Sequence, residues 1–212
     1  MTVLFTHDVF GEHETPPGHV EQQGRYRAVD RALSDADFAD LRREMPPLAD
    51  WDNIERAHSA AYVSHVRNTA PQDDMAQLDA DTFMGPHSLE AAQRGAGGAV
   101  AAVDMVMSGN AHNAFVAARP PGHHTVPDRA MGFCLFNNAA IAALHARARY
   151  GAQKIAVVDF DVHHGNGTQD ILEADEHAFF ASSHEWPQYP GTGREHERGI
   201  AGNCHNAPMS SG

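Results

Sequence analysis

The stretch IAVVDFDVHHGNG, residues 155–167, joins an apolar run directly to a cluster of aspartate and histidine side chains. Residues 155–158 are continuously apolar, which is typical of a strand buried in a parallel sheet. They follow a helical pattern over residues 138–149, and Gly151 suits the position just after the end of that helix. The stretch therefore predicts an α/β protein whose chemistry lies at the carboxyl end of a parallel strand.

Further strands and helices alternate along the rest of the chain. Short apolar runs predict three more strands, at residues 3–6, 114–118 and 178–181. Apolar residues at helical spacing predict three more helices, at residues 25–34, 59–68 and 88 to about 108, with Ser88 as the N-cap of the last. This alternation predicts an α/β fold with a parallel sheet covered on both faces, organised as a single domain over residues 1–212.

Composition and charge narrow the possible functions. The chain is 42% hydrophobic and 20% charged, as globular proteins are, and Cys134 and Cys204 are expected to be buried thiols. The formal net charge of −13 argues against direct binding of nucleic acid, which uses clusters of Lys and Arg, and would tolerate a cationic substrate. The sequence has neither a membrane span nor a signal peptide, so we expect a cytoplasmic protein without membrane contact.

Two aspartates and a histidine alternate with apolar residues directly after the apolar run. Because extended backbone alternates faces, Asp159, Asp161 and His163 should point to one side, and Phe160 and Val162 to the other. Such a cluster at the end of a buried strand needs cations to compensate its charge and its desolvation. The oxygen and nitrogen ligands suit zinc or a similar divalent ion, with room for an alkali ion on the all-oxygen side. A solvated turn is the alternative for a single DxD or HH.

A second pair of histidines lies in RPPGHH, residues 119–124. Two prolines stiffen this loop, and its glycine allows close approach of another segment. His123 and His124, if held near a metal, could act as general base and acid on an attacking water. Taken alone, they are about equally compatible with a pair of exposed loop histidines. Phe133 and Tyr189 could line an apolar slot, although single loop aromatics more often only pack.

Four motifs in this order resemble the histone deacetylase superfamily, which also contains acetoin-utilisation proteins and acetylpolyamine amidohydrolases. They are RPPGHH at 119–124, GFCLFNNAAIAA at 132–143, DFDVHHGNGTQ at 159–169 and YPGTG at 189–193. The resemblance begins near Phe5, includes a degraded motif at residues 18–21, and reaches the end of the chain, where residues 206–208 are similar to another family segment. It implies a fold of the arginase–deacetylase type, a three-layer parallel sheet flanked by helices.

The resemblance implies two cation sites. Asp161 and His163 would be two of three zinc ligands, and zinc would lower the pKa of a bound water and polarise an acetyl carbonyl. Asp159 and Ser182 would share a structural potassium or sodium ion.

The resemblance also implies the catalytic side chains. His123 and His124 would be the catalytic histidines, with His124 as the proton shuttle. Asp159 would stand behind His123, and Asn166 behind His124, where asparagine resembles the class II branch of the family. The lining of a narrow acyl-lysine tunnel would include Gly132, Phe133 and Tyr189.

Two further residues of the family site have no counterpart in these 212 residues. They are the third zinc ligand, an aspartate, and a tyrosine that stabilises the oxyanion, and their loss would leave too few ligands and cost on the order of 100-fold in rate. We therefore expect the N-terminal part of a catalytic domain, with C-terminal strands missing, an exposed sheet edge and weak or absent activity. Replacement of the missing ligand by His184 is less favoured, because ligand geometry is demanding.

The predicted reaction is zinc-dependent hydrolysis of an acetyl amide on lysine or a lysine-like amine, with release of acetate. One alternative is a protein that binds acetyl-lysine or an acyl-amine without turnover. Another is a two-manganese ureohydrolase of the same fold, which needs further bridging aspartates; RPPGHH and GFC favour the deacetylase branch. The sequence leaves open whether the partner is an acetylated lysine peptide, an acetylated polyamine or another small amine, and an oligomer is compatible with it.

Overall fold

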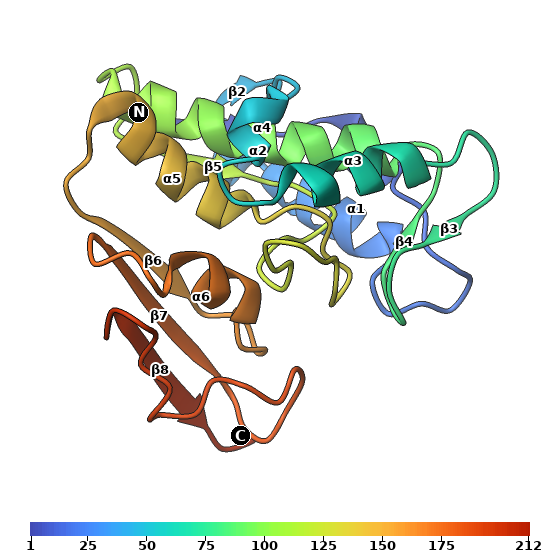
Figure 1. The fold of residues 1–212 in the computed structure, drawn as a ribbon. Coiled ribbons are helices and arrows are strands. Elements are labelled where there is room, and N and C mark those ends of the chain that lie inside the picture. The colour runs from blue at the N-terminus through green and yellow to red at the C-terminus, as the bar shows by residue number, and fades with distance from the viewer.

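The computed structural model describes residues 1–212 and contains two parallel sheets (Figure 1). The first has the strand order β2-β1-β5, formed by Arg42–Glu44, Thr2–Phe5 and Asn113–Val116. The second has the order β6-β7-β8, formed by Ile155–Asp159, Ala178–Glu185 and Cys204–Met209. A short antiparallel hairpin joins β3 (Ala76–Gln77) to β4 (Phe83–Met84). The predicted α/β class with parallel strands is confirmed.

Six α-helices accompany the sheets. They are α1 (Gln23–Leu33), α2 (Trp51–Ile54), α3 (Ala60–Thr69), α4 (Ser88–Met107), α5 (Asn138–Tyr150) and α6 (Asn166–Leu172). Two single-turn 3₁₀ helices occupy Asp8–Gly11 and Ala36–Phe38. None of the helices has both the length and the apolar character that crossing a bilayer demands.

One predicted helix cap is wrong. Helix α4 begins at Ser88, and its N-cap is His87. The Ser88 hydroxyl instead accepts a hydrogen bond from the backbone N–H of Gly85 at 2.7 Å and bonds Nδ1 of His13 at 2.5 Å. Ser88 therefore joins the start of α4 to the N-terminal loop. Cys134 and Cys204 are buried free thiols, as predicted.

The largest apolar core lies among the helices. Fifteen buried residues from α2 to α5 and their loops form it, with Phe136 and Ile141 fully enclosed. Gly97 of α4 lies against the chain at residues 47–49, where a Cβ atom would come within 2.0 Å of the Pro47 carbonyl oxygen. Helix α4 thus packs closely on residues 47–49, and the proline at the start of that segment keeps it extended.

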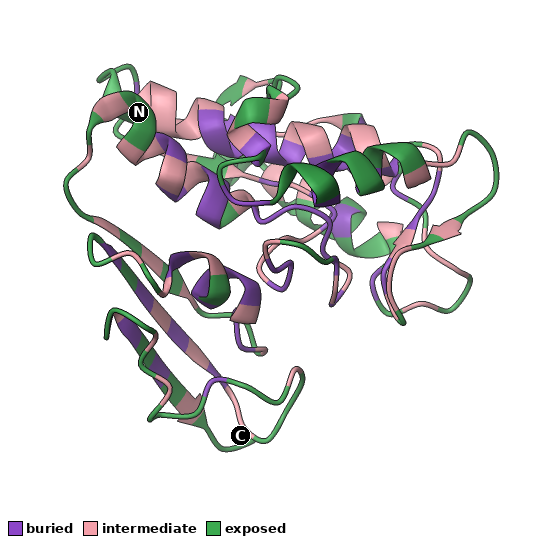
Figure 2. Cartoon of the chain, viewed as in Figure 1, coloured by how far each residue is buried: buried purple, intermediate pink, exposed green.

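The two parallel sheets are not hydrogen-bonded to each other. β5 pairs only with β1, and β6 pairs only with β7. Val158 near the end of β6 is 66% exposed, Phe115 of β5 is 50% exposed, and both strands alternate between exposed and partly buried residues (Figure 2). The side chains of Val158 and Phe115 are therefore less covered than the sequence analysis expected, and β5 and β6 each have one edge without a strand neighbour. A cavity of about 540 Å³ opens between β6 and the start of α5.

Candidate active site

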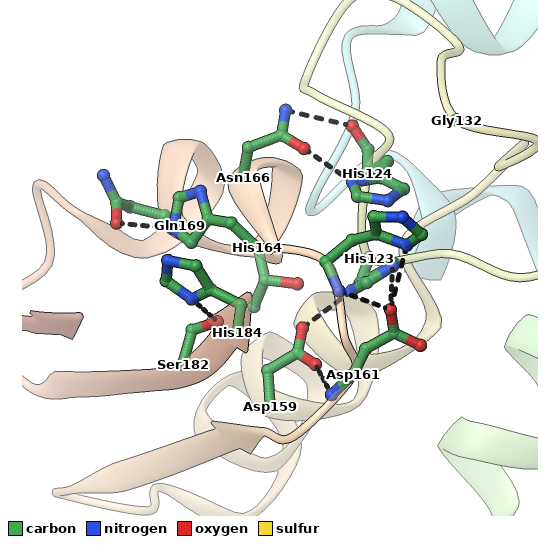
Figure 3. Close-up of polar contacts among 12 residues, drawn as sticks. His123, His124, Gly132, Asp159, Asp161, His164, Asn166, Gln169, Ser182 and His184 are labelled. Atoms are coloured by element: carbon green, nitrogen blue, oxygen red, sulfur yellow. Dashed lines mark hydrogen bonds and ion pairs between the residues drawn. The ribbon is translucent and has the colours of Figure 1, made fainter. Parts of the chain in front are cut away.

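The side chains that the sequence analysis selected as candidate site residues lie close together (Figure 3). His123 and His124 lie in the loop that follows β5, and Asp161 and His163 in the loop that follows β6. Ser182 lies on β7, directly opposite Asp159 in the parallel pairing. This arrangement follows from the fold, because the carboxyl ends of parallel strands in an α/β protein lie on the same side.

His123 is held by Asp159. Its Nδ1 lies 2.8 Å from Oδ2 of that carboxylate, whose other oxygen accepts a hydrogen bond from the Asp161 backbone N–H at 3.1 Å. Burial alone would raise the pKa of Asp159, but the hydrogen bond and the charge interaction with His123 outweigh it and lower the pKa. Asp159 is thus a charged partner that fixes the orientation of the imidazole.

His124 is held by a neutral partner. Its Nδ1 lies 2.8 Å from Oδ1 of Asn166, while the amide nitrogen of Asn166 faces the His124 carbonyl oxygen and Sδ of Met131, each at 3.4 Å. An amide oxygen only accepts, so His124 donates through Nδ1 and keeps a lone pair on Nε2. Burial, followed by the interaction with His123, lowers the pKa of His124 to about 4. The buried ring is therefore neutral at pH 7, with the lone pair on Nε2 unprotonated.

Two glycines bring Asn166 to this position at the first turn of α6. A Cβ atom on Gly165 would lie 2.1 Å from Oδ2 of Asp159, and one on Gly167 would lie 2.2 Å from the Thr125 carbonyl oxygen. The sequence GNG therefore lets the start of α6 touch both the aspartate and the loop that carries the paired histidines. The rings of His123 and His124 lie 4.0 Å apart, centroid to centroid.

Asp161 and His163 offer donors on the more open side of the site. Oδ1 of Asp161 lies 3.3 Å from Nδ1 of His163 and 4.0 Å from Nε2 of His123. These two side chains, half and one-third exposed, fit two positions of a zinc ligand set. No group of three or more His, Cys, Asp or Glu side chains in the chain is arranged to hold a metal ion. The donors present thus fit zinc only in part.

His184 is not available as the third ligand. Its ring is 2% exposed, and both nitrogens are already hydrogen-bonded, to Oγ of Ser182 at 3.0 Å and to the Gly193 carbonyl oxygen at 2.9 Å. The same contact engages the Ser182 hydroxyl, which the resemblance assigns to an alkali ion. That assignment, with Asp159 as the second ligand, stays a prediction.

The predicted tunnel residues surround His124 only in part. Tyr189 meets the rings of His124 and His163 edge-on, at centroid distances of 5.0 and 5.9 Å. Gly132 has φ +58, and a Cβ there would lie 2.4 Å from Cδ2 of His124. Phe133, also left-handed with φ 69, packs edge-on against His19 at 4.9 Å. Gly132 and Tyr189 therefore lie against His124, and Phe133 extends the aromatic surface toward the N-terminal loop.

The hairpin between β3 and β4 adds residues that the sequence analysis missed. The pKa of Tyr189 is raised, first by burial and then by the charges of Asp81 and Asp79, so this carboxylate pair lies on the tyrosine side of the site. Thr82 next to it accepts a hydrogen bond from the Phe133 backbone N–H at 3.1 Å. The only sequence signal for these residues was the pair of aspartates in LDADTF, residues 78–83. That spacing gives no indication that the pair lies near Tyr189.

The fold and the site together define an α/β protein with paired histidines and an Asp/His donor set at the carboxyl ends of parallel strands. The chain belongs to the histone deacetylase family, because residues 19–212 match the histone deacetylase domain. It is 42% identical over 184 residues, 86% of its length, to a probable deacetylase of Methanothermobacter thermautotrophicus. It is 40% identical over 176 residues, 82% of its length, to a histone deacetylase-like amidohydrolase of Pseudomonas aeruginosa.

A solved structure of the same family matches the whole chain. The crystal structure of the HDA15 HD domain superposes with a TM-score of 0.93 at 34% identity and covers 100% of this chain. This match confirms the arginase–deacetylase type of fold. The chain spans 63% of that structure, 54% of the Methanothermobacter relative and 46% of the Pseudomonas relative.

Proposed function

We propose that the protein is a zinc-dependent hydrolase that cleaves an acetyl amide on lysine or a lysine-like amine and releases acetate. The observation that carries this is the geometry of His124, whose Nδ1 is held by Asn166 and whose Nε2 is free beside the Asp161–His163 pair. Relatives named as a deacetylase and as an amidohydrolase support the same class of reaction.

Each side chain of the site would have a separate role in this reaction. Asp161 and His163 would hold zinc, which when bound lowers the pKa of water and polarises a carbonyl. His124 takes a proton from the attacking water at Nε2 and returns it to the departing amine, while Asn166 keeps the ring in one tautomer. His123, held in orientation by its hydrogen bond to Asp159, is the second imidazole available for proton transfer. The ring of Tyr189 lies edge-on against His124 and His163 and would line the acyl side of the site.

The zinc ligands proposed here, Asp161 and His163, are two, whereas catalytic zinc usually has three protein ligands. We propose that the third ligand and the oxyanion donor lie outside this sequence, so that turnover belongs to a protein that contains them. Binding of an acyl-amine without turnover is the second candidate, and the two-donor set is the observation that favours it. A two-manganese ureohydrolase is disfavoured by the family match.

The partner we propose is an acetylated lysine peptide, an acetylated polyamine or a similar small amine. A cationic partner suits the net charge of −13 and the Asp79–Asp81 pair near Tyr189. A cytoplasmic location and the absence of direct nucleic-acid binding stay predictions.

Zinc calorimetry and a fluorogenic acetyl-lysine assay test the proposal together, on this chain and on the full-length protein. We expect Asp161→Ala to weaken zinc binding in both, and His124→Ala to lower turnover of the full-length protein by at least about 100-fold without loss of zinc. The exposed His65, remote from the site, gives the matched control His65→Ala, which should change neither. Full turnover in His124→Ala would overturn the proposal, and zinc-loaded wild-type protein that binds the substrate without cleaving it would favour the second candidate.

A further inference from the structure

A buried polar cluster lies behind the site, around His164 and His184. The two rings are 1% and 2% exposed, and their centroids lie 4.8 Å apart. His164 comes from the loop after β6, and His184 from β7 (Figure 3). Neither ring takes part in the reaction proposed above, yet each is enclosed as fully as a core residue.

All four ring nitrogens have defined partners. Nδ1 of His164 bonds the Thr192 hydroxyl at 2.8 Å, and Nε2 bonds Oε1 of Gln169 at 3.2 Å. Nδ1 of His184 bonds the Ser182 hydroxyl, and Nε2 bonds the Gly193 carbonyl oxygen. Because carbonyl oxygens only accept, each neutral ring must donate through Nε2 and accept through Nδ1. The cluster therefore specifies both the tautomer and the orientation of each histidine.

Two of these partners are neighbours in the loop that carries Tyr189. Gly193 has φ +91, and a Cβ there would lie 2.5 Å from Nε2 of His184 and 2.6 Å from Cγ of His164. Its backbone N–H donates to Oε2 of Glu197 at 2.8 Å. Only glycine permits both this backbone conformation and this close approach. The two histidines thus fix the loop through their hydrogen bonds to Thr192 and Gly193.

The rest of the loop has few anchors. Its first residue, Trp186, donates its backbone N–H to the Met209 carbonyl oxygen at 2.8 Å. Within the loop, Gly191 N–H bonds the Gln188 carbonyl oxygen, and Tyr189 N–H bonds the Gln188 side chain. The Tyr189 hydroxyl makes no hydrogen bond within the chain. The position of the Tyr189 ring over His124 is therefore set from the two ends of the loop.

We propose that His164 and His184 are positioning residues that act as a latch: by gripping Thr192 and Gly193 they hold Tyr189 over His124 and His163. Loss of the latch would let the loop move outward and open the acyl side of the site. The latch stands on the contacts above, and only its effect on substrate binding rests on the proposed function.

Thr192→Val is the sharpest variant, because Thr192 is exposed and valine keeps its shape while removing the hydroxyl that His164 binds. Thr192→Ser keeps the hydroxyl and is the matched control. Trp186 reports on the loop once the other tryptophan is removed by Trp51→Phe. We expect the acrylamide quenching constant of Trp186 to rise about twofold in Thr192→Val and to stay at the parent value in Thr192→Ser. Equal quenching in the two variants would overturn the latch.

Kinetics of the full-length protein separate positioning from a merely structural role. Thr192→Val should raise KM for the acetyl-lysine substrate about fivefold, with little change in kcat. A fivefold change corresponds to the net free energy of one hydrogen bond. In a Tyr189→Ala background the same substitution should leave KM unchanged, because the latch acts through that ring. An additive effect in the double variant would overturn the proposal. If the parent shows no hydrolysis, the proposed function fails, and the quenching comparison still decides the latch.

Discussion

The helical body and the C-terminal sheet of this molecule are held together differently. The body, formed by β2-β1-β5 and α1 to α5, contains all three clusters of buried apolar residues. The sheet β6-β7-β8 has few enclosed apolar side chains, and Phe160 beside it is 87% exposed. Buried histidine, serine, glutamine and asparagine side chains fill the space between this sheet and α6. The body is thus stabilised mainly by apolar burial, and the sheet by hydrogen bonds.

The difference matters because the candidate site lies between the two parts. His123 and His124 come from the body, whereas Asp159 and Asn166 come from the sheet and its helix, and hydrogen bonds of 2.8 Å join them. The backbone N–H of Thr168 donates to the His123 carbonyl oxygen at 3.1 Å. The geometry of the site is therefore the geometry of this junction, and it is sensitive to the stability of either part.

The largest effect should come from the buried ion pair of the body. Nε and Nη2 of Arg119 lie 2.5 and 2.7 Å from the carboxylate of Glu21, and both side chains are 4% exposed. Arg119→Ala would leave this carboxylate buried without its partner and two carbonyl oxygens without a donor. We expect a loss of about 3–5 kcal/mol in the free energy of unfolding, measured by urea titration with Trp51 fluorescence.

The matched control is an exposed ion pair of the same kind. Arg42 and Glu44 lie 2.6 Å apart, but their side chains are 45% and 37% exposed. Arg42→Ala should change the free energy of unfolding by no more than about 0.5 kcal/mol. Equal losses in the two variants would show that burial of the Arg119 pair is not what makes it important to the body.

A second, smaller effect tests whether the sheet is a separate unit. Phe180 on β7 is fully buried, with its ring 6.2 Å from that of His164, while its neighbour Phe179 is 46% exposed. We expect Phe180→Ala to cost about 3 kcal/mol, since few side chains can close the cavity, and Phe179→Ala to cost less than about 1 kcal/mol. With single-tryptophan variants, Phe180→Ala should shift the urea transition of Trp186 and leave that of Trp51 nearly in place. Coincident shifts of both transitions would show that body and sheet unfold as one unit.

The sequence predicted the regular elements of the fold well where apolar periodicity was strong. Helix α5 was predicted as residues 138–149 and spans Asn138–Tyr150, and β6 was predicted one residue short. The sequence analysis missed β8, because its strand CHNAPM contains a proline and polar residues, and α6, because it starts with a glycine-flanked asparagine. An exposed sheet edge was expected, but a run of apolar residues cannot tell which strand lacks a neighbour, so its location at β5 and β6 was not predicted.

The candidate site was predictable in its residues and not in its contacts. Motif order indicated His123, His124 and the DxDxHH segment, and the structure brings them within hydrogen-bonding distance of the partners expected for them. His184 shows the limit of this reasoning. The sequence offered it as a spare metal ligand, but its contacts with Ser182 and Gly193 depend on a strand pairing and a loop that no spacing rule describes.

The smallest effect we expect is a loss in the free energy of unfolding at acidic pH. Burial lowers the pKa of His58 in the body to about 4, where its Nδ1 donates to the Val126 carbonyl oxygen and its Nε2 accepts from the Asn137 N–H. Between pH 6.5 and about 4 the unfolded chain binds a proton at this histidine that the folded chain does not. Stability contributed by His58 is therefore present above pH 6.5 and is lost as pH falls toward 4, by about 2 kcal/mol at pH 5.

His58→Gln sharpens the comparison, because the glutamine amide offers both N–H donors and a carbonyl acceptor and cannot take up a proton in this range. Burial also lowers the pKa of His164 beside the sheet to about 4, so both parts should lose stability in acid. In urea titrations at pH 7 and pH 5, the substitution should flatten the acid response reported by Trp51 and leave that of Trp186 unchanged. An unchanged Trp51 response would mean that another buried histidine of the body causes the acid sensitivity. The first candidate is His13, because burial lowers its pKa to about 3.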